Sequence, residues 1–289
     1  MRARNIVSYA ERIERAIALI EQNTLAGRPT LLCDLASAAA LSPYHFHRIF
    51  RVMTGEAVGA VVARVRLGGA LPILDYSLLN AVDKSGYATS QAFARAVKDR
   101  TGATPSALRD NPMLRKETEK SLAAPNRSDT STPPLTIKIT CVDPLRLATI
   151  RNVGDYAELN YGFGQLIECL AEQIGADAIT GLYGVPHDDP REVEAQACRF
   201  DCAVSMNAHV EPKEPICIAE FGGGSALRMI HPGDYDQIHT ALDALYLNAI
   251  TADLQIANTP LLIHFLHDPE EVPAKELVAH VFLWLNEPE

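Results

Sequence analysis

Apolar residues in the first 112 positions recur at helical spacing, and they do so twice in the same order. The apolar runs at residues 31–39 and 78–85 each predict a helix, followed by a short turn and a second helical stretch. That second stretch has an apolar face at positions i, i+3 and i+4, made of Phe46, Ile49 and Phe50 in the first copy and Phe93, Ala96 and Val97 in the second. We expect these faces to form the core of an all-α domain.

The two copies align at an offset of 47 residues. The matched pairs are Leu32 and Leu79, Phe46 and Phe93, Arg48 and Arg95, Thr54 and Thr101, and Gly55 and Gly102. Ser42 and Thr89 stand at the start of the second helices, where a hydroxyl N-cap is favoured, and Pro43 fits the first helical position. The repeat therefore predicts two helix-turn-helix units within one all-α domain.

The face opposite this core is polar and partly cationic in both copies. It carries Tyr44, His47, Arg48 and Arg51 in the first helix, and Gln91, Ala94, Arg95 and Lys98 at the same positions of the second. Arginine pairs bidentately with guanine, and glutamine pairs with adenine, in the DNA major groove. The repeated cationic helix favours binding of double-stranded DNA. For the single cations Arg51, Arg64, Arg66, Lys98 and Arg100, a phosphate contact and plain solvated surface both remain open.

The second half of the chain has a different repeat, at an offset of 79 residues. Gly154-Asp155-Tyr156 recurs as Gly233-Asp234-Tyr235, and Asp189-Pro190 recurs as Asp268-Pro269. Each copy shows a strand (147–152 and 226–231), a helix (156–174 and 235–249), a strand that ends in Asp-Pro, and a last strand (198–206 and 278–285). This order predicts a pseudo-symmetric α+β domain built from two β-α-β-β repeats, with a ligand cleft between them.

The charge of the chain divides along the same line. Residues 1–134 hold 18 Lys and Arg against 12 Asp and Glu, a net charge of +6, whereas residues 135–289 hold 8 against 24, a net charge of −16. A basic half beside an acidic half is typical of a nucleic-acid binder with an appended module. The Ser-, Thr- and Pro-rich stretch 113–134 predicts a linker. We therefore expect a multidomain protein with domains at 1–112 and 135–289.

Composition excludes several classes of protein. The 289 residues are 47% hydrophobic and 21% charged, which does not fit a disordered, collagenous or coiled-coil chain. We find no apolar run as long as a membrane span and no signal-peptide pattern, and we expect a cytoplasmic protein. Six cysteines without a C-x-x-C pair predict reduced, mostly buried thiols and no metal site. There is no Gly-rich phosphate loop or G-x-S-x-G motif, so we expect no cofactor.

Residues 6–112 resemble the DNA-binding domain of the AraC/XylS transcriptional regulators. The resemblance rests on the segments 9–17, 41–50, 85–98 and 101–105. It implies two helix-turn-helix units bridged by a long helix, reading successive major grooves about 10 bp apart. The base-facing positions that it implies are Tyr44, His47 and Arg48 in the first unit and Ser90, Gln91 and Arg95 in the second. Arg51 and Lys98, one helical turn further on, complete the predicted DNA-binding set.

Residues 135–289 resemble the GyrI-like effector-binding domain, through the segments 152–156, 184–190, 198–201, 232–235 and 267–269. This resemblance implies an aromatic-lined pocket for bulky, often cationic or lipophilic compounds, with a buried glutamate as counter-charge. Ile263 stands at the strand position of that glutamate, so we expect a neutral or weakly polar ligand. The predicted pocket residues are Ile263, Phe282 and Trp284, with Tyr161 and Phe163 as further candidates. Ordinary core packing is the alternative for each of them.

Together these features predict a DNA-binding transcriptional regulator that senses a small lipophilic or aromatic compound and contacts RNA polymerase. A monomer and a homodimer both remain open. One alternative is a ligand-sequestering protein with an appended DNA-binding domain. Another is a hydrolase, since some GyrI-like proteins are reported to hydrolyse small electrophiles. His264, His267 and His280 lie on predicted strands near the cleft, but alternation places His264 and His267 on opposite faces, which makes a poor metal pair.

Overall fold

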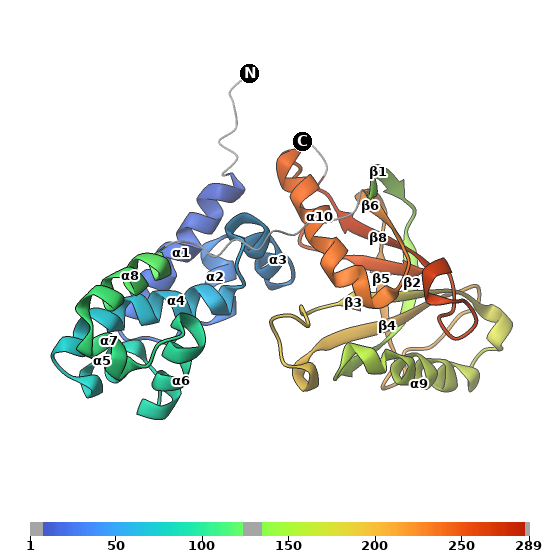
Figure 1. Ribbon diagram of the computed structural model, residues 1–289. Helices are drawn as coiled ribbons and strands as arrows, with labels where there is room; N and C mark the ends of the chain where they lie inside the picture. Colours follow the sequence, from blue (N-terminus) through green and yellow to red (C-terminus); the bar gives the residue numbers. More distant parts are fainter. Residues whose placement is uncertain (1–7, 124–134, 287–289) are drawn as a thin grey trace, which may run out of the picture. The chain divides into compact units, whose positions relative to one another are not determined.

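The computed structural model describes residues 8–123 and 135–286. The chain divides into two compact units, residues 1–129 and 130–289. Over the described residues the first unit is helical, whereas the second combines one eight-stranded antiparallel sheet with the helices α9 and α10 (Figure 1). The predicted fold class, an all-α domain followed by a pseudo-symmetric α+β domain, is confirmed.

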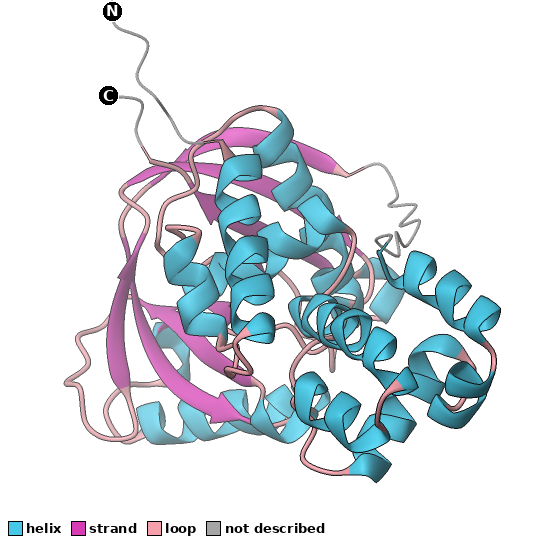
Figure 2. Cartoon of the chain, turned by 90° about the vertical axis from the view of Figure 1, so that its left-hand side faces the viewer, coloured by secondary structure: helices cyan, strands magenta, loops and turns pink. Residues whose placement is uncertain are grey.

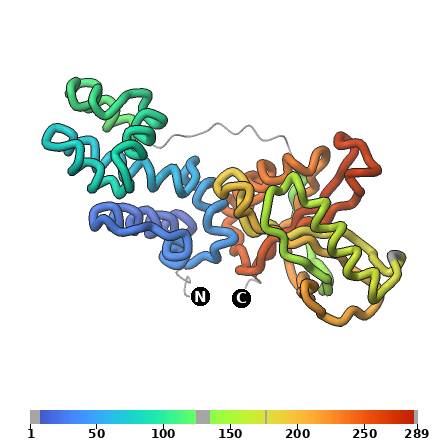
Figure 3. Tube along the Cα trace, turned by 90° about the horizontal axis from the view of Figure 1, so that it is seen from below, coloured from blue at the N-terminus to red at the C-terminus, as the bar shows by residue number. Residues whose placement is uncertain are grey.

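The first unit contains both predicted helix-turn-helix units. Its helices are α1 (Tyr9–Leu25), α2 (Leu32–Ala38), α3 (Pro43–Thr54), α4 (Val58–Ala70), the 3-10 helix η1 (Leu71–Asp75), α5 (Leu78–Ser85), α6 (Ser90–Thr101), α7 (Pro105–Asp110) and α8 (Pro112–Ala123). The pairs α2–α3 and α5–α6 form the two copies, and α4 joins them, as the trace in Figure 3 shows in blue and green. Helices α3 and α6 have 12 residues each, and their bounds differ by the predicted offset.

Both helices end in the same way. Gly55 after α3 and Gly102 after α6 adopt left-handed conformations with φ of 77° and 74°, which glycine tolerates without steric cost. The predicted core also forms, since Phe46, Ile49, Phe50, Phe93 and Val97 are fully buried. Ala96 is half-buried. The apolar spacing therefore fixed the packing face of both helices.

The two N-termini differ, and one predicted cap is wrong. The hydroxyl of Thr89 accepts a hydrogen bond from the amide of Ala92 at 3.1 Å, as expected. Ser42 occupies the N-cap position of α3, but its hydroxyl accepts no cap hydrogen bond. The backbone amide of His45, which would donate to such a cap, donates instead to the carbonyl oxygen of Ser42 at 3.1 Å.

The predicted linker begins too early. Residues 113–123 belong to α8, which packs on α4. Leu122 is buried, and its carbonyl oxygen accepts a hydrogen bond from Arg64 Nη1 at 3.0 Å. These tertiary contacts hold a helix whose sequence has little apolar periodicity. The rest of the predicted linker, residues 124–134, lies outside the described residues.

The sheet of the second unit is strongly curved (Figure 2). Its strands are β1 (Thr136–Val142), β2 (Leu145–Val153), β3 (Ile179–Pro186), β4 (Arg199–Met206), β5 (Cys217–Phe221), β6 (Gly224–Pro232), β7 (Leu262–Phe265) and β8 (Val278–Trp284). Their order across the sheet is β1-β6-β8-β7-β3-β4-β2-β5. The helix α9 (Leu159–Ala171) follows β2, and α10 (Ile238–Thr251) follows β6.

The repeat predicted from the sequence governs this topology. Strands β2 and β6 have bounds that differ by 79 residues, the offset of the repeated motifs. Each repeat contains one strand more than predicted, because β1 precedes β2 and β5 precedes β6. Each added strand pairs with the other repeat, β1 with β6 and β5 with β2. The two repeats also meet in the middle of the sheet, where β3 pairs with β7.

The two faces of the sheet differ. Helix α9 packs on one face, where its Leu166 and Leu170 contact Ile150 and Val204. The opposite face, here called the Trp284 face, carries a cluster to which the described parts of α9 and α10 contribute no residue. Its members are Leu147, Tyr183, Val185, Ala203, Phe221, Ala226, Leu262, Phe282 and Trp284.

Over the described residues, no single helix has the length and apolar composition of a membrane span, although α3 and α4–η1, bent by 60°, meet both criteria as a pair.

Candidate nucleic-acid interface and ligand site

Helix α6 presents its predicted polar row to solvent. Ser90, Gln91, Arg95 and Lys98 are all exposed, and the side chain of Arg95 is 86% exposed. Its only ion-pair contact among the described residues is with Asp99, at 3.6 Å. An exposed ion pair of this kind contributes little, so the guanidinium can exchange Asp99 for another acceptor. The row is therefore free to contact DNA.

A shallow groove of about 510 Å³ runs beside this row. It is lined by Leu78, Ala94, Arg95, Lys98, Asp99, Thr104, Pro105 and Ser106. These residues come from α6, from the first residue of α5, and from the N-cap and first two residues of α7 (Pro105–Asp110). The start of α7 is capped by Thr104, whose hydroxyl accepts a hydrogen bond from the amide of Ala107 at 3.2 Å. The groove thus borders α6 on the side that carries Arg95 and Lys98.

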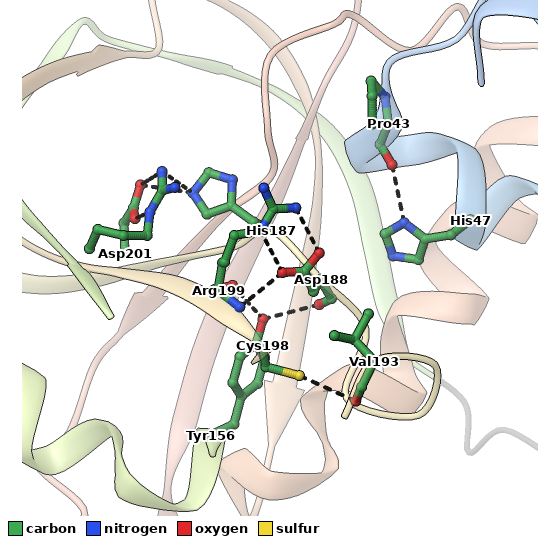
Figure 4. Close-up of polar contacts among 10 residues, drawn as sticks. Pro43, His47, Tyr156, His187, Asp188, Val193, Cys198, Arg199 and Asp201 are labelled. Carbon is green, nitrogen blue, oxygen red and sulfur yellow. Dashed lines mark hydrogen bonds and ion pairs between the residues drawn. The ribbon is translucent and has the colours of Figure 1, made fainter. Parts of the chain in front are cut away.

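The corresponding residues of α3 are less exposed. Tyr44 and Arg51 are half-buried, whereas His47 and Arg48 are buried. His47 Nδ1 lies 3.2 Å from the carbonyl oxygen of Pro43, one turn earlier in the helix (Figure 4). Base contacts by these four residues stay a prediction.

A buried carboxylate connects the two helix-turn-helix units. Glu56, in the turn after α3, is 4% exposed. Its Oε2 accepts a hydrogen bond from Arg64 Nε of α4 at 2.9 Å, and its Oε1 accepts one from Arg100 Nη2 of α6 at 2.7 Å. Arg64 and Arg100, which the sequence left open as phosphate contacts, are thus engaged inside the unit. This triad fixes α6 relative to the end of α3.

The repeated Gly-Asp-Tyr motif has a structural role in both halves of the sheet. The hydroxyl of Tyr156 lies 2.8 Å from the carbonyl oxygen of Arg199 and 3.1 Å from that of Asp188 (Figure 4). In the second repeat, the hydroxyl of Tyr235 lies 3.0 Å from the carbonyl oxygens of both His267 and Val278. Each tyrosine therefore ties the segment after one strand to the start of the last strand.

Charged residues of the first repeat pair with one another beside Tyr156. Asp188 accepts hydrogen bonds from Arg199 at 2.8 Å (Figure 4). Asp201 forms an ion pair with Arg151. His187 Nε2 lies 2.8 Å from Asp201 Oδ2. Burial alone would raise the pKa of Asp201, but its hydrogen bonds with His187 and Arg151 hold that pKa below its usual value. These carboxylates are neutralised within the protein.

The structure separates the predicted pocket residues. Phe282 and Trp284 lie together on the Trp284 face, where their rings stack with centroids 6.2 Å apart. Ile263 is buried but pairs with Val281, which places it on the opposite face of the sheet. Phe163 packs on that opposite face, with its ring 6.0 Å from that of Phe265, and Tyr161 is 81% exposed on α9. Only Phe282 and Trp284 are brought together.

The residue that joins the aromatic pair from β7 is His264, which the sequence placed near the cleft but not among the predicted pocket residues. His264 stacks on Tyr183 at 4.3 Å between centroids, and its ring lies 6.3 Å from that of His280. Burial lowers the pKa of His264, and the nearby His280 lowers it further. Burial likewise lowers the pKa of His280, together with the charges of Arg228 and Lys138. Both imidazoles are therefore neutral near pH 7.

Comparison with known families matches both units. Residues 135–285 match the GyrI-like small molecule binding domain. The chain belongs to this family. Residues 35–111 match a helix-turn-helix domain, of AraC type. Both resemblances expected from the sequence are confirmed, and the second unit is called the GyrI-like domain below.

The matches with individual relatives span only part of each relative's length. The right origin-binding protein of Escherichia coli (strain K12) is 33% identical over 93 residues, which are 29% of this chain and 30% of that protein. The transcriptional regulator Rob of Salmonella typhimurium is 33% identical over 90 residues, 28% of this chain and 29% of its own. The chain thus spans less than a third of the length of these relatives.

A solved structure covers both units at low similarity. In the cryo-EM structure of an EcmrR–DNA complex, one chain matches 94% of this chain and 95% of its own length, with 12% identity and a TM-score of 0.45.

The cysteines and histidines of the GyrI-like domain form no metal site within the described residues. Only Cys198 and Cys202 are buried, whereas Cys33, Cys141 and Cys217 are exposed, so the expectation of mostly buried thiols is wrong. Cys33 lies in the short helix α2 and Cys141 in the edge strand β1, and both elements leave one side exposed to solvent. Burial raises the pKa of Cys202 to about 12, although its hydrogen bond with Asn152 opposes the shift.

Proposed function

We propose that the chain is a one-component transcriptional regulator that binds double-stranded DNA through α3 and α6 and senses a small molecule in its GyrI-like domain. The observation that carries this proposal is the repetition of a 12-residue helix, α3 and α6, in a chain that also contains a small-molecule-binding domain. The second of these helices exposes Gln91, Arg95 and Lys98 in one row.

Each polar residue of α6 has a distinct proposed role. Arg95 suits bidentate contact with guanine, and Gln91 suits contact with adenine, because both side chains are exposed in the first half of the helix. Lys98 lies about one turn further along and suits a phosphate contact, with Ser90 at the first helical position. In α3 the same roles fall to Tyr44, His47, Arg48 and Arg51. The Glu56 triad supports a fixed spacing between the two helices.

The proposed regulation follows from preferential binding. A ligand that binds one of two states of the protein shifts the population toward that state, and so changes DNA affinity or a contact with RNA polymerase. We propose no catalytic step. Hydrolysis would need a positioned acid or base, and a measurement of substrate turnover would reveal such an activity.

The test uses the full-length protein and the DNA fragment that it enriches from genomic fragments. Binding affinity is measured with and without each member of a panel of lipophilic and aromatic compounds. The proposal requires at least one compound that changes affinity or footprint. Arg95→Ala is compared with Arg15→Ala, which removes an exposed arginine of α1. If Arg95→Ala keeps the affinity of Arg15→Ala for the selected site, α6 is not a reading helix.

A further inference from the structure

The Trp284 face carries two neighbouring cations, on the adjacent strands β1 and β6. Arg228 of β6 lies directly opposite Lys138 of β1 in the sheet register. In the part of the chain that the structure describes, neither side chain forms an ion pair with an acidic residue. Like charges directly opposite one another destabilise a sheet, so this arrangement works against folding. A cost of this kind is typical of a functional site.

Two buried hydrogen-bond donors lie on the same face. Nε of Arg228 and Nε1 of Trp284 are buried, and neither has a hydrogen-bond partner among the described residues. Trp284 pairs with Ala226, which lies two residues before Arg228. Trp284 and Arg228 are therefore diagonal neighbours on adjacent strands, and residues in such positions are about 7–8 Å apart. Trp284 is itself 5% exposed. Both atoms can only donate, and a buried donor without an acceptor is costly.

The surroundings of these donors are aromatic, and the described strands of this face carry no unpaired carboxylate. The rings of Phe282 and Trp284 stack, and the ring of His280 lies 6.3 Å from that of Phe282. The acidic residue of this sheet face, Asp201, is neutralised by Arg151 and His187 two strands beyond β7. A cationic ligand would meet Arg228 and Lys138 with no carboxylate to balance its charge.

We propose that the Trp284 face binds an aromatic carboxylate, whose ring packs on Phe282 and Trp284 and whose carboxylate accepts hydrogen bonds from Arg228 and Trp284. This ligand class rests on the proposed sensing function and makes it specific. The charge of this ligand is opposite to that of the cationic compounds that the resemblance to the GyrI-like family implies. Arg228 and His280 are half-buried, and Lys138 is exposed, so a ligand arriving from solvent meets these residues before the rings.

The half-buried histidines add a pH dependence. On this face, His264 of β7 lies opposite His280, and Arg228 of β6 lies diagonal to it. Lys138 of β1 and Tyr183 of β3 lie one strand further away on either side. All but Tyr183 are basic, and a bound carboxylate stabilises the protonated form of His280. Ligand affinity is therefore expected to rise as the pH falls from 7.5 toward 5.5.

The experiment compares three probes of one shape with the full-length protein: 4-tert-butylbenzoate, 4-tert-butylbenzamide and 4-tert-butylbenzylammonium. Binding is followed by calorimetry and by the emission of Trp284, the only tryptophan in the chain. The benzoate is expected to bind about tenfold or more tightly than the other two. Arg228→Gln is expected to remove this preference, whereas the control Arg146→Gln, on the other face of the sheet, keeps it.

The outcomes separate this inference from the proposed function. Equal or tighter binding of the amide or the ammonium compound overturns the carboxylate assignment, and so does unchanged benzoate binding in Arg228→Gln. Failure of all three probes to bind overturns it as well. Sensing itself fails only if no compound of the wider lipophilic panel alters DNA binding.

Discussion

Arg100 of α6 donates a 2.7 Å hydrogen bond to the carboxylate of Glu56, which lies 44 positions earlier in the chain. Glu56 is buried, and Arg64 of α4 is its second partner. A buried carboxylate with two guanidinium partners holds three helices in one arrangement. The relative placement of two DNA-reading helices decides whether both can enter successive grooves. The triad therefore fixes the spacing between α3 and α6.

Replacing Glu56 by Gln is expected to destabilise the helical unit by about 1–3 kcal/mol, because two half-buried arginines lose a buried charged acceptor. The measurement is urea unfolding followed by circular dichroism and by the emission of Trp284, which reports only on the GyrI-like domain. The tryptophan transition should not move. As a control, Arg109→Ala removes an exposed ion pair with Asp110 and should change stability by less than about 0.5 kcal/mol. An unaltered helical transition in Glu56→Gln contradicts the account.

Lys98→Ala is expected to weaken binding to all DNA sequences about equally, because a phosphate contact carries no sequence information. The slope of log affinity against log salt concentration should fall by about one unit. Lys116→Ala, which removes an exposed lysine of α8, provides the matched control. A loss confined to the selected site would assign Lys98 to base reading instead.

Tyr156→Phe and Tyr235→Phe are each expected to cost about 1 kcal/mol of stability in the GyrI-like domain, since each leaves a strand carbonyl without its side-chain donor. The two sites lie in different repeats, so the double variant should lose the sum of the two single losses. Urea unfolding followed by Trp284 emission measures all three variants. A loss at one tyrosine only would show that the two repeats are not equivalent in energy.

The repeats made much of the fold predictable. The bounds of α6 follow from those of α3, because apolar spacing and a terminal glycine recur together at Gly55 and Gly102. Strands β1 and β5 were missed because each pairs with the other repeat, and no local pattern encodes such a partner. Helix α8 was missed because its contacts with α4, such as that of Arg64 with Leu122, stabilise a weakly amphipathic segment.

The ligand site was harder to predict than the fold. Successive residues of a strand point to opposite faces of the sheet, so Ile263 and His264 lie on different faces although they are neighbours in sequence. Alternation within β7 is visible in the sequence, but the register of β7 against β8 is not. That register pairs His264 with His280 and so decides which residues join Phe282 and Trp284.

Acidification is expected to destabilise the GyrI-like domain below about pH 6.5. The folded state lowers the pKa of His264 and His280, chiefly by burial, so the unfolded chain binds more protons as the pH falls below the ordinary histidine value of 6.5. The stability present above that value is then lost progressively. The variant His264→Gln/His280→Gln should show a smaller loss between pH 7.5 and 5.5 in urea unfolding. An identical pH profile in the variant would exclude these histidines as the cause.

Thiol chemistry should follow burial. Cys33, Cys141 and Cys217 are exposed and are expected to react with an alkylating reagent in the folded protein. Cys198 and Cys202 are buried, and burial raises the pKa of both thiols, so they should react only after unfolding. Mass spectrometry of the labelled protein identifies each site. Rapid labelling of Cys202 in the folded state would contradict the packing of β4.

The most direct test of the central claim is a footprint of the full-length protein on its selected DNA site at near-physiological salt. Two reading helices predict two contacted segments about 10 bp apart on one side of the duplex. Arg95→Ala should lose one of these segments and about 1–3 kcal/mol of specific binding. Failure to enrich any sequence, with binding that disappears as salt rises, would contradict the claim, because it would leave only non-specific attraction to the backbone.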